Sequence, residues 1–216
     1  MLPPPISTVH ERGSRVQLSE KEKLILVIGR FNVRGHNKCQ LDAVRAFVEL
    51  KQRAVLSSDW KLVVAGHVNP NPDNETYVEQ CRRVGLGHRV EVRTNISIEE
   101  LCELYRRASF LWQFTGIELP FGVDPSKCEH LGLVALDCFG YGVVPVVYQR
   151  SGVAMMLNSG QNGFVFGSTR DLAGLMGLLG THWKAAYHQQ LFNASLKMGR
   201  EFSHAKFVER VGGLVY

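Results

Sequence analysis

The sequence predicts an α/β fold in which a parallel sheet of about six strands carries helices on both faces. Two observations support this prediction. Short apolar runs alternate along the chain with longer stretches whose apolar residues recur at helical spacing. The short runs are apolar at nearly every position, as expected of strands that are buried on both faces.

Each element can be assigned in order. The predicted strands are LILVIG (24–29), KLVVAG (61–66), RVEVR (89–93), SFLWQF (109–114), VVPVVY (143–148) and GFVF (163–166). The predicted helices cover 39–54, 74–86, 97–108, 132–140, 169–180 and 184–210. We expect Asp73 or Asn74 to cap the second helix, whereas Ser97 and Glu100 have the spacing of a capping box at the start of the third.

The segment before the first strand has a different composition. Residues 1–23 contain three consecutive prolines followed by polar and charged residues, which is typical of an interdomain linker. They lack the apolar core of a signal peptide, and no apolar run approaches the roughly 18 residues needed to span a bilayer. We therefore expect a leader over 1–23 and a single domain over 24–216.

Charge and cysteine content restrict the class of protein. The net charge of +5 favours anionic ligands but is too small to indicate a nucleic-acid partner. The five cysteines are odd in number and form no CxxC pair, which argues against a disulfide scaffold and a zinc site. Free thiols indicate a reducing compartment, and we predict a cytoplasmic location.

The first candidate site is the loop GRFNVRGHNKCQ (29–40), which joins the first strand to the first helix. It contains four basic side chains, those of Arg30, Arg34, His36 and Lys38. Gly29 lets the backbone approach a ligand closely, and a basic loop before a helix is suited to a diphosphate. The alternative is a solvated loop with ordinary surface cations. The loop matches neither a Walker motif nor GxGxxG.

The second candidate is the stretch CEHLGLVALDCFGYGVVPVVY (128–148). Gly132 begins a predicted helix whose N-terminus, with about half a positive charge, would stabilise an anion. Glu129 precedes that helix and Asp137 lies about one turn inside it, and both carboxylates could accept hydrogen bonds from sugar hydroxyls. The alternative makes Glu129 a capping acid and Asp137 a solvated polar residue.

The third candidate is the long segment that follows FLWQF and begins with Thr115 and Gly116. Long loops at the carboxyl edge of a parallel sheet are often functional. We expect Trp112 to be a core residue. Of the histidines, only His36 and His130 fall in candidate loops. The sequence has no DxD motif and no His/Asp cluster with metal-ligand spacing, so no metal is expected.

Taken together, these segments resemble the donor-binding half of retaining glycosyltransferases of the GT-B fold, the large group 1 (family 4). The likeness spans about residues 24–180. The matching segments are ILVIGRF…GHNKCQLDAVRAF, LVVAGH, VEVRTNISIEELCELYRRASFLWQFTG, EHLGLVALDCFGYGVVPVV and SGVAMMLNSGQNGFVF. The resemblance implies a Rossmann-like domain that forms one half of a GT-B fold.

The resemblance also implies roles for individual residues. Catalytic roles fall on Glu129, Arg30 and Lys38, with the two cations holding the donor diphosphate and Glu129 contacting the transferred sugar. The implied donor-binding residues are Gly29, Asn95, Ile96, Gly116, His130, Gly132, Leu133 and Asp137. Among them, Asn95 and Ile96 match the turn that cradles the base, and Asp137 matches the acid that holds the ribose.

Two positions depart from the family pattern. Asp137 replaces the usual Glu, and Met155 stands where the family often has Glu. The implied donor is a UDP- or GDP-linked sugar. The implied acceptor is a glycan or a lipid-linked molecule, which an N-terminal domain or a partner chain would bind and which would allow peripheral membrane association. Polysaccharide biosynthesis is the corresponding process.

Other functions remain open at this point. One is a non-catalytic nucleotide-sugar-binding or interaction module, and another is a subunit of a two-chain transferase. A nicotinamide oxidoreductase is disfavoured because GxGxxG is absent. A glycoside hydrolase would also use two carboxylates but would not need the basic loop at 29–38.

Overall fold

The fold is a six-stranded parallel sheet, as the sequence predicts. The computed structural model describes residues 16–34, 36–117, 119, 128–129 and 132–212 of the chain. The strands pair in parallel in the order β3-β2-β1-β4-β5-β6. They are β1 (Glu22–Ile28), β2 (Lys61–Gly66), β3 (Val90–Thr94), β4 (Ala108–Gln113), β5 (Val144–Tyr148) and β6 (Phe164–Phe166).

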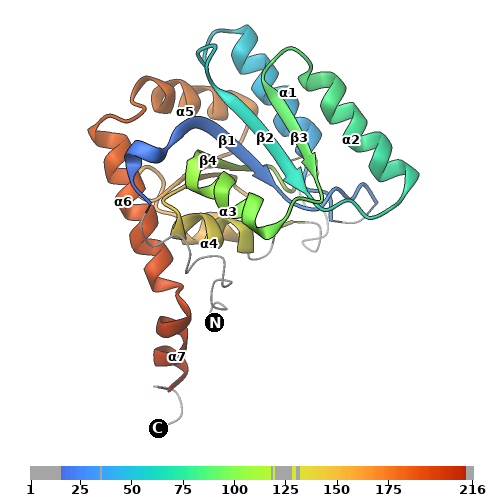
Figure 1. Cartoon of the computed structure of the whole chain (residues 1–216). Helices are drawn as coiled ribbons and strands as arrows, with labels where there is room; N and C mark the ends of the chain where they lie inside the picture. Colours follow the sequence, from blue (N-terminus) through green and yellow to red (C-terminus); the bar gives the residue numbers. More distant parts are fainter. Residues whose placement is uncertain (1–15, 35, 118, 120–127, 130–131, 213–216) are drawn as a thin grey trace.

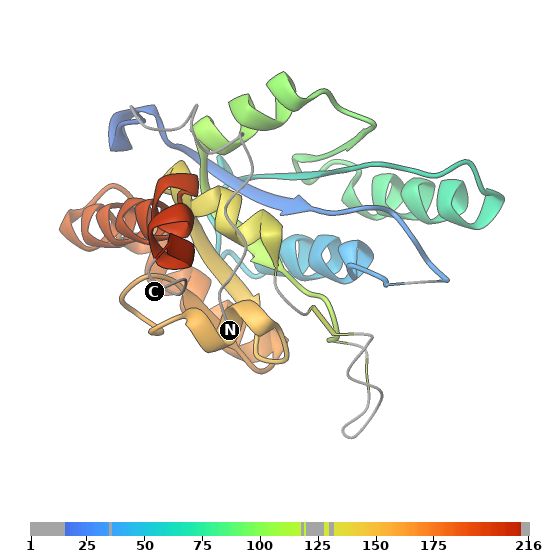
Figure 2. The same cartoon turned by 90° about the horizontal axis from the view of Figure 1, so that it is seen from below.

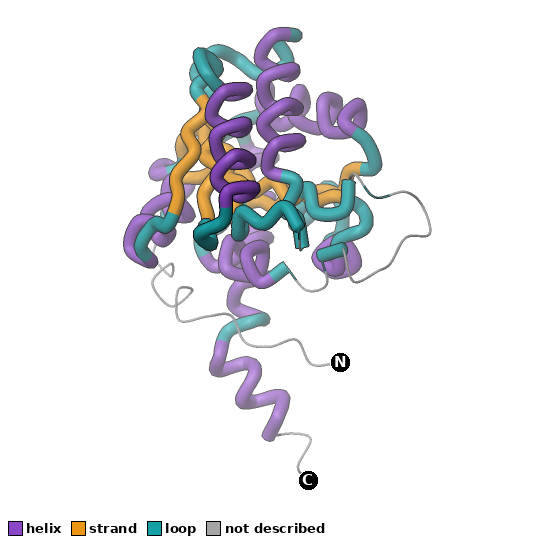
Figure 3. The backbone as a smooth tube through the Cα atoms, turned by 90° about the vertical axis from the view of Figure 1, so that its right-hand side faces the viewer, coloured by secondary structure: helices purple, strands orange, loops and turns teal. Residues whose placement is uncertain are grey.

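Helices cover both faces of this sheet (Figure 1). The α-helices are α1 (Gln40–Gln52), α2 (Pro72–Gly85), α3 (Ile98–Arg107), α4 (Leu133–Gly140), α5 (Thr169–Thr181), α6 (Ala186–Glu201) and α7 (His204–Gly212). Two short 3-10 turns, η2 (Leu18–Glu20) and η4 (Gly152–Met156), complete the described elements. Figures 1 and 2 place α2 and α6 at opposite ends of the molecule, and α7 runs out from the body of the domain (Figures 1 and 3).

The core consists of two apolar layers, one on each face. One layer joins the sheet to α1, α2 and α5, and it includes Phe47, Trp60 and Phe110. The other joins the sheet to α3 and α4 and includes Phe139. Trp112 is 1% exposed and lies in the first layer, which confirms its assignment to the core.

The structure corrects three details of the sequence prediction. The stretch predicted as one helix over 184–210 is divided into α6 and α7, because the Ser203 hydroxyl accepts the backbone N–H of Lys206 and so starts a new helix. The cap of α2 is Asn71, not Asp73 or Asn74. Its side chain accepts the N–H of Asp73, and a proline at the first helical position fixes the start. The turn η4 is not predicted by periodicity.

The start of the domain also differs in detail from the expected strand. β1 begins at Glu22, and Arg107 donates two hydrogen bonds to that carboxylate, at 2.7 and 3.0 Å. Val16 and Lys21, which precede the strand, are buried. The Lys21 ammonium donates to the carbonyl oxygen of Tyr105 at 2.9 Å. The segment from Val16 onward therefore packs as part of the domain.

The Ser97–Glu100 capping box at the start of α3 is present as predicted.

His188 is a buried titratable group in the same layer as Phe110. It is 2% exposed, its ring stacks on Phe110 at 5.4 Å, and its Nδ1 accepts the backbone N–H of Lys184 at 3.0 Å. Burial, with a smaller contribution from the positive charges of Lys21 and Lys184, lowers the pKa of His188 to about 4.

This arrangement predicts a pH-dependent stability. The unfolded chain has a histidine pKa of about 6.5, so between pH 6.5 and 4 the unfolded state binds more protons than the folded state. The free energy of unfolding should therefore fall as the pH drops through this window, by up to about 1.4 kcal/mol per pH unit from this group. His188→Asn, which keeps an acceptor near Nδ1, should flatten that slope in urea unfolding measured from pH 4.5 to 7. The exposed His182, changed to Asn, is the control; an unchanged slope in His188→Asn would contradict the assignment.

Candidate functional site

The order of the strands determines where a ligand can bind. The chain builds the sheet outward from β1 to β3, then returns to place β4 on the other side of β1 and continues outward to β6. In open α/β sheets, the crevice at such a reversal, outside the carboxyl ends of the strands, is the usual ligand site. Here it lies beyond the ends of β1 and β4.

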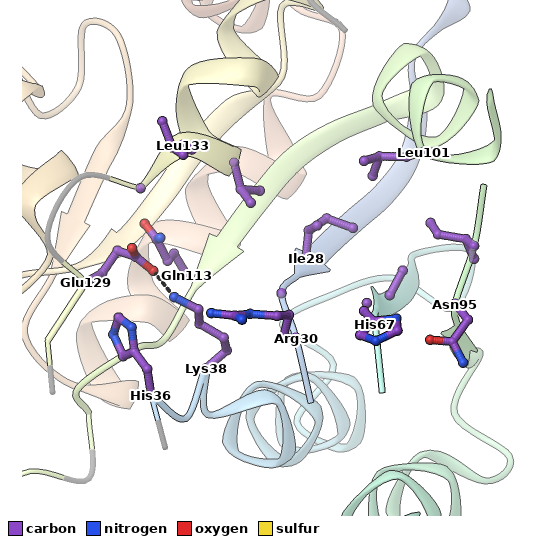
Figure 4. A pocket seen from close by; sticks show the side chains of 16 residues that line it. Ile28, Arg30, His36, Lys38, His67, Asn95, Leu101, Gln113, Glu129 and Leu133 are labelled. Atoms are coloured by element: carbon purple, nitrogen blue, oxygen red, sulfur yellow. Dashed lines mark hydrogen bonds and ion pairs between the residues drawn. The ribbon is translucent and has the colours of Figure 1, made fainter. Parts of the chain in front are cut away.

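A cavity of about 640 Å³ occupies this position (Figure 4). Its walls come from the segments after β1, β2, β3 and β4 and from the start of α4. The residues that line it are Ile28, Gly29, Arg30, His36, Lys38, Ala65, Gly66, His67, Asn95, Ile96, Leu101, Gln113, Glu129, Gly132, Leu133 and Val134. The first candidate loop and the second candidate stretch therefore meet in one cavity.

The side chain of Gln40 fixes the backbone that carries Arg30. Gln40 is fully buried at the first position of α1, and its Nε2 donates to the carbonyl oxygens of Gly29 and Arg30, both at 3.1 Å. Gly66 lies so close that a Cβ there would collide with the Gly29 carbonyl oxygen. The Arg30 guanidinium forms no hydrogen bond or ion pair with any residue that the structure describes, and Figure 4 shows it extending into the cavity. It is therefore available to an anion.

Lys38 and Glu129 form an ion pair across the cavity (Figure 4). Their side chains are 18% and 13% exposed, so both charges are largely shielded from water. The position of the Glu129 backbone is fixed by η4, because the carbonyl oxygen of Glu129 accepts the N–H of Gly152 at 2.6 Å. The alternative role of Glu129 as a helix cap does not hold: the cap of α4 is Gly132, which has no side chain to donate or accept.

The start of α4 contributes backbone donors to the cavity. Gly132 adopts a left-handed conformation, with φ of 65°, and a Cβ there would also collide with Val153. The first N–H groups of a helix have no acceptor within the helix, and α4 has no side-chain cap. Gly132, Leu133 and Val134 line the cavity, so this partly positive helix end borders it.

The far end of the cavity is formed by the turn after β3. The backbone of Asn95 adopts a left-handed conformation, with φ of 53°, and its N–H donates to the Gly66 carbonyl oxygen at 2.9 Å. Its side-chain oxygen accepts the N–H of Val68, also at 2.9 Å. Ile96 and His67 border the same end. In Figure 4, His67 and Asn95 lie at one end, Arg30 and Lys38 in the middle, and Glu129 and Gln113 at the other end.

Most of the residues proposed from the sequence are brought together in this cavity, and some are not. Its lining includes Gly29, Arg30, Lys38, Asn95, Ile96, Glu129, Gly132 and Leu133. Asp137 is half-buried on α4, one turn beyond Leu133, and does not line the cavity. Gly116, with φ of 91°, is close to Cys128 and likewise does not line it. His130 lies outside the described residues.

The sequence prediction missed several lining residues, of which Gln113 and His67 are the polar ones. Both stand at the carboxyl end of a predicted strand, Gln113 within SFLWQF and His67 directly after KLVVAG. The rule that ligands bind at strand ends would have selected them. Among the described residues, no group of three or more His, Cys, Asp or Glu side chains has the arrangement of a metal site.

The family model described as "Glycosyl transferases group 1" matches residues 11–176. No curated protein matches the chain significantly in sequence.

Several solved structures share the fold. Sucrose-phosphate synthase from Thermosynechococcus elongatus is 18% identical, with a TM-score of 0.68 over 99% of this chain and 49% of that chain. The C-terminal domain of a group 1 family glycosyl transferase from Francisella tularensis is 16% identical, with a TM-score of 0.61 over 94% of this chain and 97% of that one. Anabaena HepE in complex with UDP is 14% identical, with a TM-score of 0.66 over 92% of this chain and 49% of the HepE chain.

These likenesses establish the fold and set the scale of the chain. This chain spans about half the length of the sucrose-phosphate synthase and HepE chains, at 49% of each. The neighbours are glycosyltransferases of the GT-B type, in agreement with the resemblance found in the sequence. The family model matches well over half of the residues of this chain, so the chain belongs to the group 1 glycosyl transferases.

Proposed function

We propose that this chain is the donor-binding half of a retaining glycosyltransferase, which binds a nucleoside-diphosphate hexose with UDP or GDP as the nucleotide. One observation supports this more than any other. Across the cavity, a polar turn at Asn95, two cations and a carboxylate follow one another. A nucleotide sugar presents a base, a diphosphate and a hydroxyl-rich sugar in the same order.

The chemistry of each group fits that assignment. Arg30 and Lys38 would hold the diphosphate through charge-assisted hydrogen bonds, and the N-terminus of α4 would add backbone donors. In sugar transfer, negative charge develops on the departing diphosphate. Fixed positive charges at that position stabilise the transition state. Because these groups supply the positive charge, the proposal includes no metal ion.

Transfer also needs an acceptor held in line with the sugar. In this proposal a second domain or a partner chain binds a glycan or lipid-linked acceptor, in polysaccharide biosynthesis in the cytoplasm. Orienting two substrates can contribute about 7–11 kcal/mol to lowering a barrier. The isolated chain should therefore bind the donor and transfer its sugar slowly or not at all. Among the described residues, no helix is both long and apolar enough to cross a bilayer.

A second candidate is a non-catalytic nucleotide-sugar-binding module. It is favoured by the position of Asp137, which does not line the cavity, and by Met155, which is 90% exposed. Both candidates require donor binding, and only the first requires turnover when the acceptor-binding half is supplied.

The proposal predicts selective binding of a nucleoside diphosphate. Titrating the chain with UDP, GDP and ADP should raise the midpoint of thermal unfolding for one nucleotide, since saturation at 100 times the dissociation constant adds about 2.7 kcal/mol of stability. Lys38→Met and Arg30→Met should each reduce that shift, because each removes a charge that contacts phosphate. Methionine keeps the Lys38 stem, which packs against Gly29.

Arg34→Met is the matched control for this titration. Arg34 lies in the same loop, pairs with Asp73 and does not line the cavity. It should behave as the unchanged chain does. An equal loss of the shift in all three variants would point to general loop charge, and no shift with any nucleotide would refute the donor site.

The ion pair predicts an opposite effect for Glu129. Its carboxylate competes with a diphosphate for the Lys38 ammonium and repels the phosphate charge. Glu129→Gln should therefore bind the nucleoside diphosphate several-fold more tightly than the unchanged chain in calorimetric titration. In the assembled transferase, the same variant should lose turnover. Weaker binding of the diphosphate by Glu129→Gln would show that the carboxylate supports the phosphate site and does not compete with it.

A further inference from the structure

Gln113 occupies the point at which the sheet reverses direction. It is the last residue of β4, directly beside the end of β1, and it lines the cavity next to Glu129 (Figure 4). Its neighbours in the sequence, Trp112 and Phe114, are buried aromatic residues. A single half-buried polar residue between them, at a ligand crevice, needs a partner for its hydrogen-bonding groups.

The orientation of the Gln113 amide is determined by Ser151. The Ser151 hydroxyl lies 3.2 Å from Gln113 Oε1 and donates to it, because an amide oxygen can only accept. Ser151 is 2% exposed, and its Oγ also accepts the N–H of Val153 at 3.2 Å, which fixes the direction of the hydroxyl. The Gln113 oxygen thereby has a partner, whereas the amide nitrogen has none among the described residues.

The Gln113 amide lies in the wall of the cavity, beside the start of α4. Nε2 and Oε1 of Gln113 lie 3.4 and 3.5 Å from the position that a Cβ on Gly132 would take. A Cβ at that position would collide with Cγ2 of Val153, so Val153 packs against Gly132 beside this amide. No residue that the structure describes accepts a hydrogen bond from Nε2. The cavity therefore contains a neutral donor, with its two N–H bonds, held by a buried hydroxyl.

The surroundings indicate what this donor would bind. At this end of the cavity, Glu129 can only accept hydrogen bonds when ionised, and the group of Gln113 that has no partner among the described residues is its amide nitrogen, a donor. A diphosphate offers acceptors alone and would be repelled by Glu129. A sugar hydroxyl both donates and accepts, so neighbouring hydroxyls of one ring can satisfy both residues together.

We propose that Gln113 donates its amide N–H to a hydroxyl of the transferred sugar and thereby helps to select that sugar, while Ser151 positions the amide. The inference rests on the proposed donor function and extends it to the sugar. A site built to hydrogen-bond a substrate hydroxyl rejects analogues that lack it more strongly than an apolar pocket rejects a change of shape. The position of Gln113 at a strand end could have indicated it, whereas no sequence pattern indicates Ser151.

The test compares two ligands on the same variants. Calorimetric titration measures the affinity of each protein for UDP and UDP-glucose, GDP and GDP-mannose, and ADP and ADP-glucose. Gln113→Met keeps the size of the side chain and removes its donor. It should bind the nucleoside diphosphate as the unchanged chain does and the matching nucleotide sugar about tenfold more weakly, as expected for one hydrogen bond to a ligand.

Gln149→Met is the matched control, since Gln149 is an exposed glutamine directly after β5 and does not line the cavity. It should leave both affinities unchanged. Deoxy-sugar forms of the preferred donor give a further test. The analogue that lacks the contacted hydroxyl should bind the unchanged chain and Gln113→Met equally, and the other analogues should still distinguish them.

The outcomes separate the two proposals. If the unchanged chain binds none of the nucleoside diphosphates, the donor function itself is wrong. Suppose instead that the unchanged chain binds a diphosphate. If Gln113→Met then weakens binding of the diphosphate and of the nucleotide sugar equally, or changes neither affinity, the sugar contact is wrong and the donor function stands. The same conclusion follows if every deoxy analogue still distinguishes the two proteins.

Discussion

The parallel pairing of β1 with β4 is the constraint on which the rest of the structure depends. It forces the chain to return from β3 to the centre of the sheet, so the segments that follow β1 and β4 leave the same edge side by side. This brings together Lys38 and Glu129, which are 91 residues apart in the chain. It also sets Gln113 beside the loop that carries Arg30. The cavity is therefore a product of topology, and the ends of β1, β2, β3 and β4 each contribute one part of it.

The electrostatics of the cavity follow from how each charge is held. Placing cations in a partly buried crevice costs desolvation energy unless a counter-charge is present. The ion pair with Glu129 offsets that cost for Lys38 when no ligand is bound. Arg30 is more exposed and is held through its backbone by Gln40, so it needs no counter-charge. A diphosphate bound here would thus meet the Arg30 guanidinium, which has no counter-charge among the described residues, and the Lys38 ammonium, which is already paired with Glu129. In the proposed donor site, the affinity for phosphate and the contact with the sugar would therefore be coupled through Glu129.

Sequence patterns predicted the sheet well because the physical signal is local. Strands buried on both faces must be apolar throughout, and the six runs are visible without any tertiary information. The loop cations and Glu129 could also be selected, since residue type and position after a strand suffice. The break between α6 and α7 depends on one serine hydroxyl, and the cap of α2 lies one residue before a proline. The role of Gln40, and the orientation of Gln113 by Ser151, depend on contacts between distant segments, which no periodicity encodes.

The two acids of the second candidate stretch differ in what the fold allows them to reach. Glu129 precedes α4 and extends into the cavity, whereas Asp137 lies on the helix one turn behind Leu133, on the same helical face. Leu133 is 55% exposed and lines the cavity together with Val134 and Leu101, so this wall presents apolar surface to a ligand. A ribose contact from Asp137 must pass that wall, and it remains a prediction. At the opposite end, the cavity presents the carboxylate of Glu129, which is an acceptor, and the amide nitrogen of Gln113, which is a donor. We therefore propose that the sugar, more than the ribose, is the part of a donor that this cavity discriminates.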